Sequence, residues 1–210
     1  MEVERFEFNP FRENTYILYD NSRECVIVDA GCNTKEEEKV LIEFIVRMQL
    51  TPKYLLNTHT HIDHILGNKY IKDKYNLSPH FHQKDLFIYQ NSIDIAVMYN
   101  LSYSFLDAPY EMLNDNQEIF FGNTTLKCIH TPGHSPGSIC FYNELDAILI
   151  AGDVLFRESI GRTDLPGGNH KQLLANISEK LFTLPDNVKV YPGHMSSTTI
   201  KHEKMYNPFF

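Results

Sequence analysis

Three histidines and one aspartate lie within six consecutive positions of this chain, at His59, His61, Asp63 and His64. They directly follow residues 53–56, an apolar run that is typical of a short buried strand. Neutral imidazole nitrogen and carboxylate oxygen are ligands that zinc, iron and manganese share. On one turn without a cation, these groups would repel one another or compete for protons. A loop of solvated histidines is the alternative, and the density of ligand types favours a metal site over it.

Three further candidate ligands each follow a predicted strand and lie next to a glycine. They are His134 in the turn-rich segment 131–137, Asp153 after the strand 147–151, and His194 after the strand 188–191. Seven candidates suit two adjacent metal ions better than one four-coordinate structural site. We expect one ion to be bound by His59, His61 and His134 and the other by Asp63, His64 and His194, with Asp153 bridging the two.

Two adjacent cations would define the chemistry of such a site. Water between them loses a proton far more readily than bulk water, which gives hydroxide at neutral pH. One cation also polarises a substrate carbonyl and stabilises the oxyanion that forms on attack. The chain then needs no serine or cysteine nucleophile. We expect Asp63 to have a catalytic role besides binding metal, because its free oxygen can accept a hydrogen bond from the nucleophile and pass a proton to the leaving group.

Other charged residues near the candidate ligands have supporting interpretations. Asp29 follows the apolar run 25–28 and precedes a turn glycine, so it either orients a ligand histidine or forms the turn. Arg162 and Asp164 lie in a glycine-bounded loop, where we expect them to pair and brace the loop of Asp153 rather than contact substrate. Three further histidines are expected to be structural or solvated and not ligands: His130, His170 and His202.

The elements that must position these residues follow from hydrophobic periodicity. Alternation predicts an antiparallel pair of strands at residues 3–8 and 14–19. Thr34 and Glu37 form a capping-box pattern, which begins a helix that ends before Pro52. The same criteria predict helices at residues 65–75 and about 171–182, and strands at residues 119–121, 125–130, 138–142, 147–151 and 188–191.

No repeat, low-complexity tract or linker divides the chain, so we predict that residues 1–210 form a single domain. Residues 83–113 are less regular and contain many aromatic side chains. Core packing explains most of these aromatics, and the rest suit a lid over a substrate cleft. The pattern identifies no individual substrate-contacting residue in this region.

The composition excludes several classes of partner. The chain has 210 residues, 42% of them hydrophobic, and a formal net charge of −8. An acidic chain without clustered Lys and Arg is not expected to bind nucleic acid or an anionic membrane. A small-molecule substrate remains the expected partner, and the sequence does not specify an oligomeric state.

The four cysteines form no Cys-x-x-Cys pair, and three of them lie in or beside apolar runs. We therefore expect free, mostly buried thiols in a reducing compartment. The first residues lack the basic and then apolar pattern of a signal peptide, and no apolar run has membrane-spanning length. A soluble cytoplasmic protein is the resulting expectation.

The His-x-His-x-Asp-His motif at residues 59–64, followed by His134, Asp153 and His194, resembles the metallo-β-lactamase superfamily, and all seven positions match its dinuclear members. Within the superfamily the chain is most similar to glyoxalase II-like (hydroxyacylglutathione hydrolase-like) enzymes. The segments that carry this similarity are residues 9–11, 14–16, 131–137, 152–156, 161–164 and 191–194. The resemblance implies an αββα sandwich, in which two mixed β-sheets are flanked by helices and the metals lie at one edge.

The resemblance further implies a metal-dependent hydrolase of a small thioester or ester that uses two divalent ions, with zinc expected and iron or manganese as alternatives. Glyoxalase II itself has an additional C-terminal helical region that contacts glutathione, whereas this chain resembles a short form without it. Two alternatives remain open. One is a persulfide dioxygenase-like oxidoreductase, which shares the fold but uses a single iron. The other is a non-catalytic metal-binding module.

Overall fold

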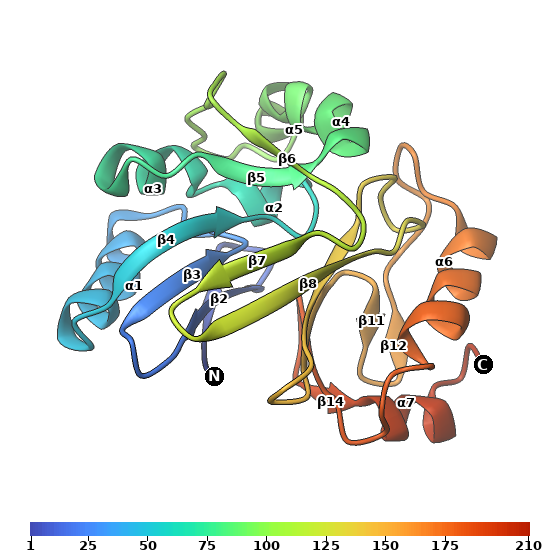
Figure 1. The fold of residues 1–210 in the computed structure, drawn as a ribbon. Helices are drawn as coiled ribbons and strands as arrows, with labels where there is room; N and C mark the ends of the chain where they lie inside the picture. Colours follow the sequence, from blue (N-terminus) through green and yellow to red (C-terminus); the bar gives the residue numbers. More distant parts are fainter.

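Two six-stranded β-sheets pack face to face in the computed structural model, which describes residues 1–210 (Figure 1). The first sheet has the order β1 (Glu2–Phe8), β2 (Glu13–Tyr19), β3 (Glu24–Val28), β4 (Thr51–Leu56), β5 (Pro79–His82) and β6 (Glu111–Leu113). The second has the order β14 (Thr198–Thr199), β13 (Lys189–Pro192), β10 (Ile148–Gly152), β9 (Ile139–Asn143), β8 (Thr124–His130) and β7 (Glu118–Phe121). A separate hairpin pairs β11 (Leu155–Phe156) with β12 (Ser159–Ile160).

Both sheets are mixed. In the first sheet, β1 to β3 are antiparallel and β3 to β6 are parallel. In the second, β7 to β10 are antiparallel, while β13 is parallel to β10 and antiparallel to β14. Parallel neighbours place their carboxyl ends at one edge of a sheet, so the loops that follow β4 and β10 begin at defined edges. The predicted αββα sandwich of two mixed sheets flanked by helices is confirmed.

Apolar side chains from both sheets fill the space between them. Tyr16 and Val26 of the first sheet are fully buried with Leu126, Phe141 and Ile150 of the second. Alternation along the strands places these side chains in the core, because successive residues of a strand point to opposite faces. All four cysteines are free and buried, as their apolar surroundings predict.

Helices cover the outer faces of the sandwich. On the first sheet, α1 (Lys35–Arg47) begins at Thr34 with the predicted capping box to Glu37 and buries Leu41, Phe44 and Ile45. On the second sheet, α6 (His170–Asn176) continues as a π-helical segment, η2 (Ile177–Leu181), and buries Leu173 and Ile177 against β9, β10 and β13. The last helix is α7 (Ile200–Tyr206).

The predicted helix at residues 65–75 is wrong in its start and continuity. The structure has a short helix α2 (Ile62–Ile65), an interruption at Leu66 and Gly67, and then α3 (Asn68–Tyr75). At the interruption the amide of Gly67 donates a hydrogen bond to the carbonyl of Ala30 at 2.7 Å. A Cβ atom at Gly67 would lie 2.9 Å from that carbonyl, so the backbones can approach only because the residue is glycine.

The irregular region at residues 83–113 contains more structure than its pattern predicts. It begins with the 3-10 helix η1 (Gln83–Asp85), followed by α4 (Leu86–Gln90) and α5 (Ser92–Met98). Tyr89 and Ala96 of these helices are buried against Phe81 of β5 and Ile65 of α2. Core packing thus accounts for part of the aromatic content of this region.

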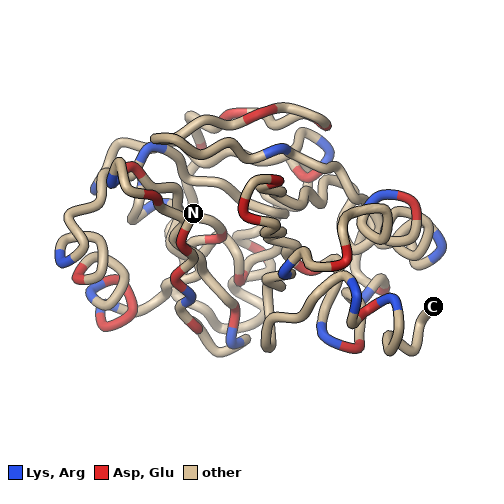
Figure 2. Tube along the Cα trace, turned by 60° about the horizontal axis from the view of Figure 1, so that its bottom comes forward, with Lys and Arg blue, Asp and Glu red and all other residues tan.

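Charged residues of both signs are interspersed along the outer helices and loops (Figure 2). None of the helices combines the length and the apolar character needed to cross a membrane.

Candidate metal centre

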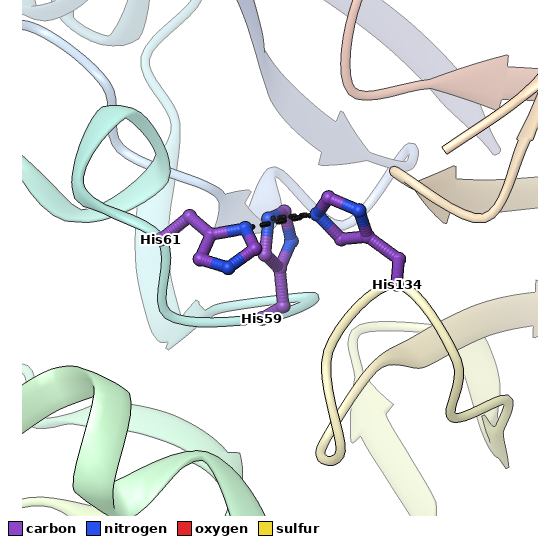
Figure 3. Close-up of side chains that lie close together, drawn as sticks. All are labelled: His59, His61 and His134. Atoms are coloured by element: carbon purple, nitrogen blue, oxygen red, sulfur yellow. Dashed lines mark hydrogen bonds between the residues drawn. The ribbon is translucent and has the colours of Figure 1, made fainter. Parts of the chain in front are cut away.

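Loops from both sheets bring all seven predicted ligands to one edge of the sandwich. His59 and His61 follow β4, and Asp63 and His64 lie in the adjoining helix α2. From the second sheet, His134 follows β8, Asp153 follows β10 and His194 follows β13. Figure 3 shows His59, His61 and His134 pointing toward one another from two separate loops.

The first cluster consists of three histidines. Nε2 of His134 lies 2.9 Å from Nδ1 of His61 and 3.2 Å from Nε2 of His59. Oδ2 of Asp153 lies 3.6 Å from the same His134 nitrogen. Donor atoms around a tetrahedral ion, at metal–nitrogen distances of about 2.0–2.1 Å, are separated by roughly 3.3–3.4 Å. The spacing of this cluster therefore fits a common metal ion.

The second cluster combines two histidines with two carboxylates. Oδ2 of Asp63 lies 3.1 Å from Nε2 of His194 and 3.6 Å from Nε2 of His64. Asp153 also reaches this cluster, since its Oδ1 is 3.5 Å from His64 Nε2 and its Oδ2 is 3.5 Å from His194 Nε2. Asp153 thus lies between the two clusters, in the position that a bridging carboxylate requires.

Two atoms of this centre are buried without a hydrogen-bond partner, His64 Nε2 and Asp153 Oδ1. Buried polar atoms in folded proteins are nearly always paired, and an unpaired one costs about 1–3 kcal/mol. Each of the two atoms points at the other ligands of the second cluster. A cation at this point would satisfy both, so the residues of the second cluster fit a divalent ion.

The protonation states also suit metal binding. Burial lowers the pKa of His59 far below the ordinary value, and the neighbouring imidazoles lower it further. Burial and His134 lower the pKa of His61 to about 3. His64 lowers the pKa of Asp153, although burial opposes this, so the carboxylate is ionised. Metals bind neutral imidazole and ionised carboxylate, the forms that these pKa shifts favour at His59, His61 and Asp153. At His64 burial lowers the pKa, but the carboxylates of Asp63 and Asp153 raise it well above its usual value, so a cation bound there would displace a proton.

Four of the five histidines have their outer nitrogen fixed by an oxygen atom. This contact determines which ring nitrogen keeps a lone pair for a metal. The contacts are His59 Nδ1 to Thr58 Oγ1 at 3.1 Å, His64 Nδ1 to Asp29 Oδ2 at 3.1 Å, His134 Nδ1 to the Arg162 carbonyl at 2.8 Å, and His194 Nδ1 to the Phe11 carbonyl at 3.1 Å. With the proton on the outer nitrogen, each Nε2 would face the centre with a free lone pair, as a metal ligand requires.

Asp29 lies in the turn after β3 and also contacts Thr58, next to the ligand His59, and the ligand His64. Its backbone is in the left-handed region, with φ at 52°. Oδ1 accepts a hydrogen bond from the Thr58 amide at 2.7 Å, and Oδ2 accepts from Thr58 Oγ1 at 2.6 Å and from His64 Nδ1. The structure therefore gives Asp29 a place in the turn and a contact that orients a ligand histidine.

Arg162 and Asp164 pair, yet the pair does not touch the loop of Asp153 through its side chains. The guanidinium donates two hydrogen bonds of 2.7 Å to the carboxylate, and the two side chains are 59% and 67% exposed. The Asp153 carbonyl instead lies against Gly161, where a Cβ atom would be only 1.8 Å away. The link from this loop to the centre is the Arg162 carbonyl that holds His134.

These contacts predict that one of two neighbouring substitutions leaves stability unchanged and that the other lowers it. Arg162→Ala should leave the thermal midpoint and metal content near those of the parent protein, because an exposed ion pair contributes little and the backbone carbonyl remains. Gly161→Ala should lower the free energy of unfolding by about 1–3 kcal/mol, because its methyl group overlaps the Asp153 backbone. Urea unfolding and elemental analysis of both variants check this. Equal losses in the two variants would contradict it.

Two buried acidic residues near the centre were not predicted as site residues. Glu13 is fully buried, with Oε1 3.9 Å from His64 Nδ1 and Oε2 accepting a hydrogen bond from Thr15 Oγ1 at 2.9 Å. Burial raises the pKa of Glu13 well above its usual value. Asp85 is also fully buried, between the loops of His59 and His134. The only local signal for Glu13 is a polar run at the start of an otherwise apolar strand.

The αββα fold and a histidine–aspartate cluster at its edge define a class of metal-binding proteins. Residues 9–194 match the model of the metallo-beta-lactamase superfamily. The chain therefore belongs to that superfamily.

Several relatives match over nearly their whole length. The chain is 32% identical to the hydroxyacylglutathione hydrolase GloC of Haemophilus influenzae, over 100% of this chain and 98% of the relative. Among solved structures, BLEG-1 B3 metallo-beta-lactamase is 35% identical with a TM-score of 0.90, covering 99% of both chains. TTHA1623, solved in a di-iron-bound form, is 32% identical with a TM-score of 0.89, covering 99% of this chain and all of the other. The superfamily match and the name of the Haemophilus relative support a hydrolase in general.

Proposed function

We propose that this protein is a metal-dependent hydrolase of small thioesters or esters and binds two divalent ions. The observation that carries the proposal is the pair of ligand clusters that share Asp153 and leave His64 Nε2 and Asp153 Oδ1 unpaired. His59, His61 and His134 would hold one ion, Asp63, His64 and His194 the other, and Asp153 would contact both. Zinc is the expected metal, and iron or manganese would suit the same ligands.

Bound at these residues, divalent ions supply an ionised water near neutral pH and polarise a carbonyl. The chain provides the positions around that chemistry. His61, Asp63 and His194 are only partly buried, so they mark the side from which substrate enters. Asp63 is placed there to accept a hydrogen bond from the attacking water and to return a proton to the leaving group. A thiolate leaves readily, so thioesters need this second proton transfer least.

The region after α5 supports the expectation of a lid. The Phe11 ring packs edge-on against Tyr99, with centroids 5.2 Å apart, while the Phe11 carbonyl holds His194. Tyr99 lies within residues 83–113 and is half exposed. Tyr99 is therefore one residue removed from His194, through Phe11, and this part of the region would border a substrate bound at the open side of the centre.

The similarity to hydroxyacylglutathione hydrolase supports a thioester substrate, and the similarity to BLEG-1 favours β-lactams as a second candidate substrate class. Both reactions require attack of water on a carbonyl carbon. The iron-dependent persulfide dioxygenase alternative uses one ion, so metal content and oxygen uptake distinguish it from the hydrolase. A non-catalytic module would require a closed set of ligands, whereas part of this set faces solvent.

Elemental analysis of protein purified without added metal, combined with three activity assays, tests the proposal. We expect about two ions per chain and hydrolysis of a lactoyl-thiol thioester that a chelator abolishes. Hydrolysis of a chromogenic β-lactam without thioester turnover would favour the second candidate. One iron per chain with oxygen uptake on a persulfide would overturn the hydrolase, and metal binding without any of these activities would leave the non-catalytic module.

A further inference from the structure

The carboxylate of Asp85 is fully buried and outside both ligand clusters. Asp85 ends η1, which follows β5, and its side chain points between the loops after β4 and β8. Burial raises the pKa of Asp85 to about 6, and hydrogen bonds from Ser135, Gly137 and Thr60 oppose this shift. Near neutral pH the group is therefore an ionised carboxylate that only accepts hydrogen bonds.

Asp85 receives hydrogen bonds from both loops. From the first, the Thr60 amide donates to Oδ2 at 3.1 Å and the Thr60 hydroxyl donates to the Asp85 carbonyl at 2.9 Å. From the second, the Ser135 hydroxyl donates to Oδ2 at 2.8 Å and the Gly137 amide donates to Oδ1 at 2.5 Å. One side chain thus joins two segments that are distant in sequence.

Two of the three donor residues are immediate neighbours of ligands in the three-histidine cluster. Thr60 lies between His59 and His61, and Ser135 follows His134. A shift of either loop would therefore move a ligand imidazole.

The surroundings fit the carboxylate closely. A Cβ atom at Gly137 would lie 2.6 Å from the Asp85 carboxyl carbon, so the amide reaches Oδ1 only because the residue is glycine. Ser138 Oγ accepts a hydrogen bond from the Ser135 amide at 3.1 Å and lies 2.8 Å from Ser135 Oγ, which fixes the serine that contacts Asp85. The structure has no such link from Asp85 to Asp63, His64 or His194.

We propose that Asp85 is a positioning residue that sets the geometry of the three-histidine metal site by tying its two loops together, and that the other metal site does not depend on it. The inference rests on the metal binding in the proposed function but not on the substrate. Asp85→Asn keeps the size of the side chain and replaces one acceptor oxygen with a donor that faces N–H or O–H groups. At least one of the three hydrogen bonds to the side chain is then lost, so the connection between the two loops is weakened.

Metal titration of single-site proteins tests this directly. In a His194→Ala background only the three-histidine cluster keeps its full set of terminal ligands, and in a His134→Ala background only the other cluster does. Co²⁺ is titrated into metal-free protein in competition with a chromophoric chelator, and its visible absorption bands report the ligand geometry. Asp85→Asn should weaken Co²⁺ binding about 10–100-fold in the first background, with altered bands, and leave the second unchanged.

A second variant keeps the test decisive if Asp85→Asn fails to fold. Ser135→Ala removes one hydroxyl donor and should weaken the same site by a smaller factor, again without affecting the other. Unchanged affinity in both variants, or equal weakening of both sites, would overturn the proposal. Thioester turnover by the parent protein is a separate measurement, so failure of the hydrolase assignment cannot be mistaken for failure of this inference.

Discussion

Asp153→Asn is expected to reduce kcat for thioester hydrolysis on the order of 10²–10³-fold, the size of effect seen when one electrostatic contact in an active site is removed. Asp153 is the one residue whose two oxygens reach both clusters, His134 on one side and His64 and His194 on the other. Asparagine offers a single acceptor oxygen in place of two. Its amide N–H group would point at imidazole nitrogens whose lone pairs are needed to bind a metal. The bridge between the clusters is then lost.

The metal content of Asp153→Asn separates this explanation from a general defect. We expect it to fall from about two ions per chain to one or fewer, while far-UV circular dichroism remains that of the parent protein. Asp164→Asn is the matched control, because it removes an exposed aspartate on the other side of the β11–β12 hairpin that pairs with Arg162 and with none of the ligands. Full metal content together with parental turnover in Asp153→Asn would refute the bridging role.

The positions of the seven candidate ligands were predictable from local patterns. Five of them lie in a turn or beside a glycine after a short apolar run, and Asp63 and His64 lie in the one-turn helix that follows the same run, so local sequence places all seven near strand ends. The capping box of Thr34 and Glu37 fixed the start of α1 for the same reason, since it depends on residues three positions apart. Local rules suffice where the determining contacts are local.

Contacts between distant segments explain what the sequence did not reveal. The break at Gly67 depends on the carbonyl of Ala30, and nothing near Gly67 signals this. Asp85 contacts Thr60 and Gly137, which approach it only after both sheets have formed. A single carboxylate in a helical turn is indistinguishable from a solvated one until its partners are known.

The case of Arg162 shows a different limit. Its pairing with Asp164, two positions away, was predicted correctly from spacing. Its relation to the centre was not, because the contact with His134 is made by the backbone carbonyl of Arg162. The type of side chain at a position does not predict whether its backbone carbonyl will contact a histidine.

Asp29→Asn is expected to lower the free energy of unfolding of the metal-free protein by about 2–4 kcal/mol, since hydrogen bonds to charged groups contribute roughly 1.5–3 kcal/mol each. The aspartate accepts from the Thr58 amide, the Thr58 hydroxyl and His64 Nδ1, all buried. An amide at this position has one oxygen for donors on two sides, so either orientation leaves a buried donor facing its nitrogen. Urea unfolding measures the loss, and Asp146→Asn, an exposed aspartate paired with the N-terminus, should remain near the parent value.

Asp29→Asn changes the charge and hydrogen bonding of the side chain without changing the strain of the backbone. Asp29 has a φ of 52°, a conformation that asparagine adopts at least as readily, so the turn itself is not destabilised. The amide would also favour the tautomer of His64 that carries its proton on Nε2, the nitrogen directed at Asp63 and Asp153. Metal affinity at the second cluster should therefore fall about 10–100-fold in addition to the loss of stability. A variant that unfolds more easily but binds metal as tightly as the parent would show that Asp29 supports the turn alone and does not orient the histidine.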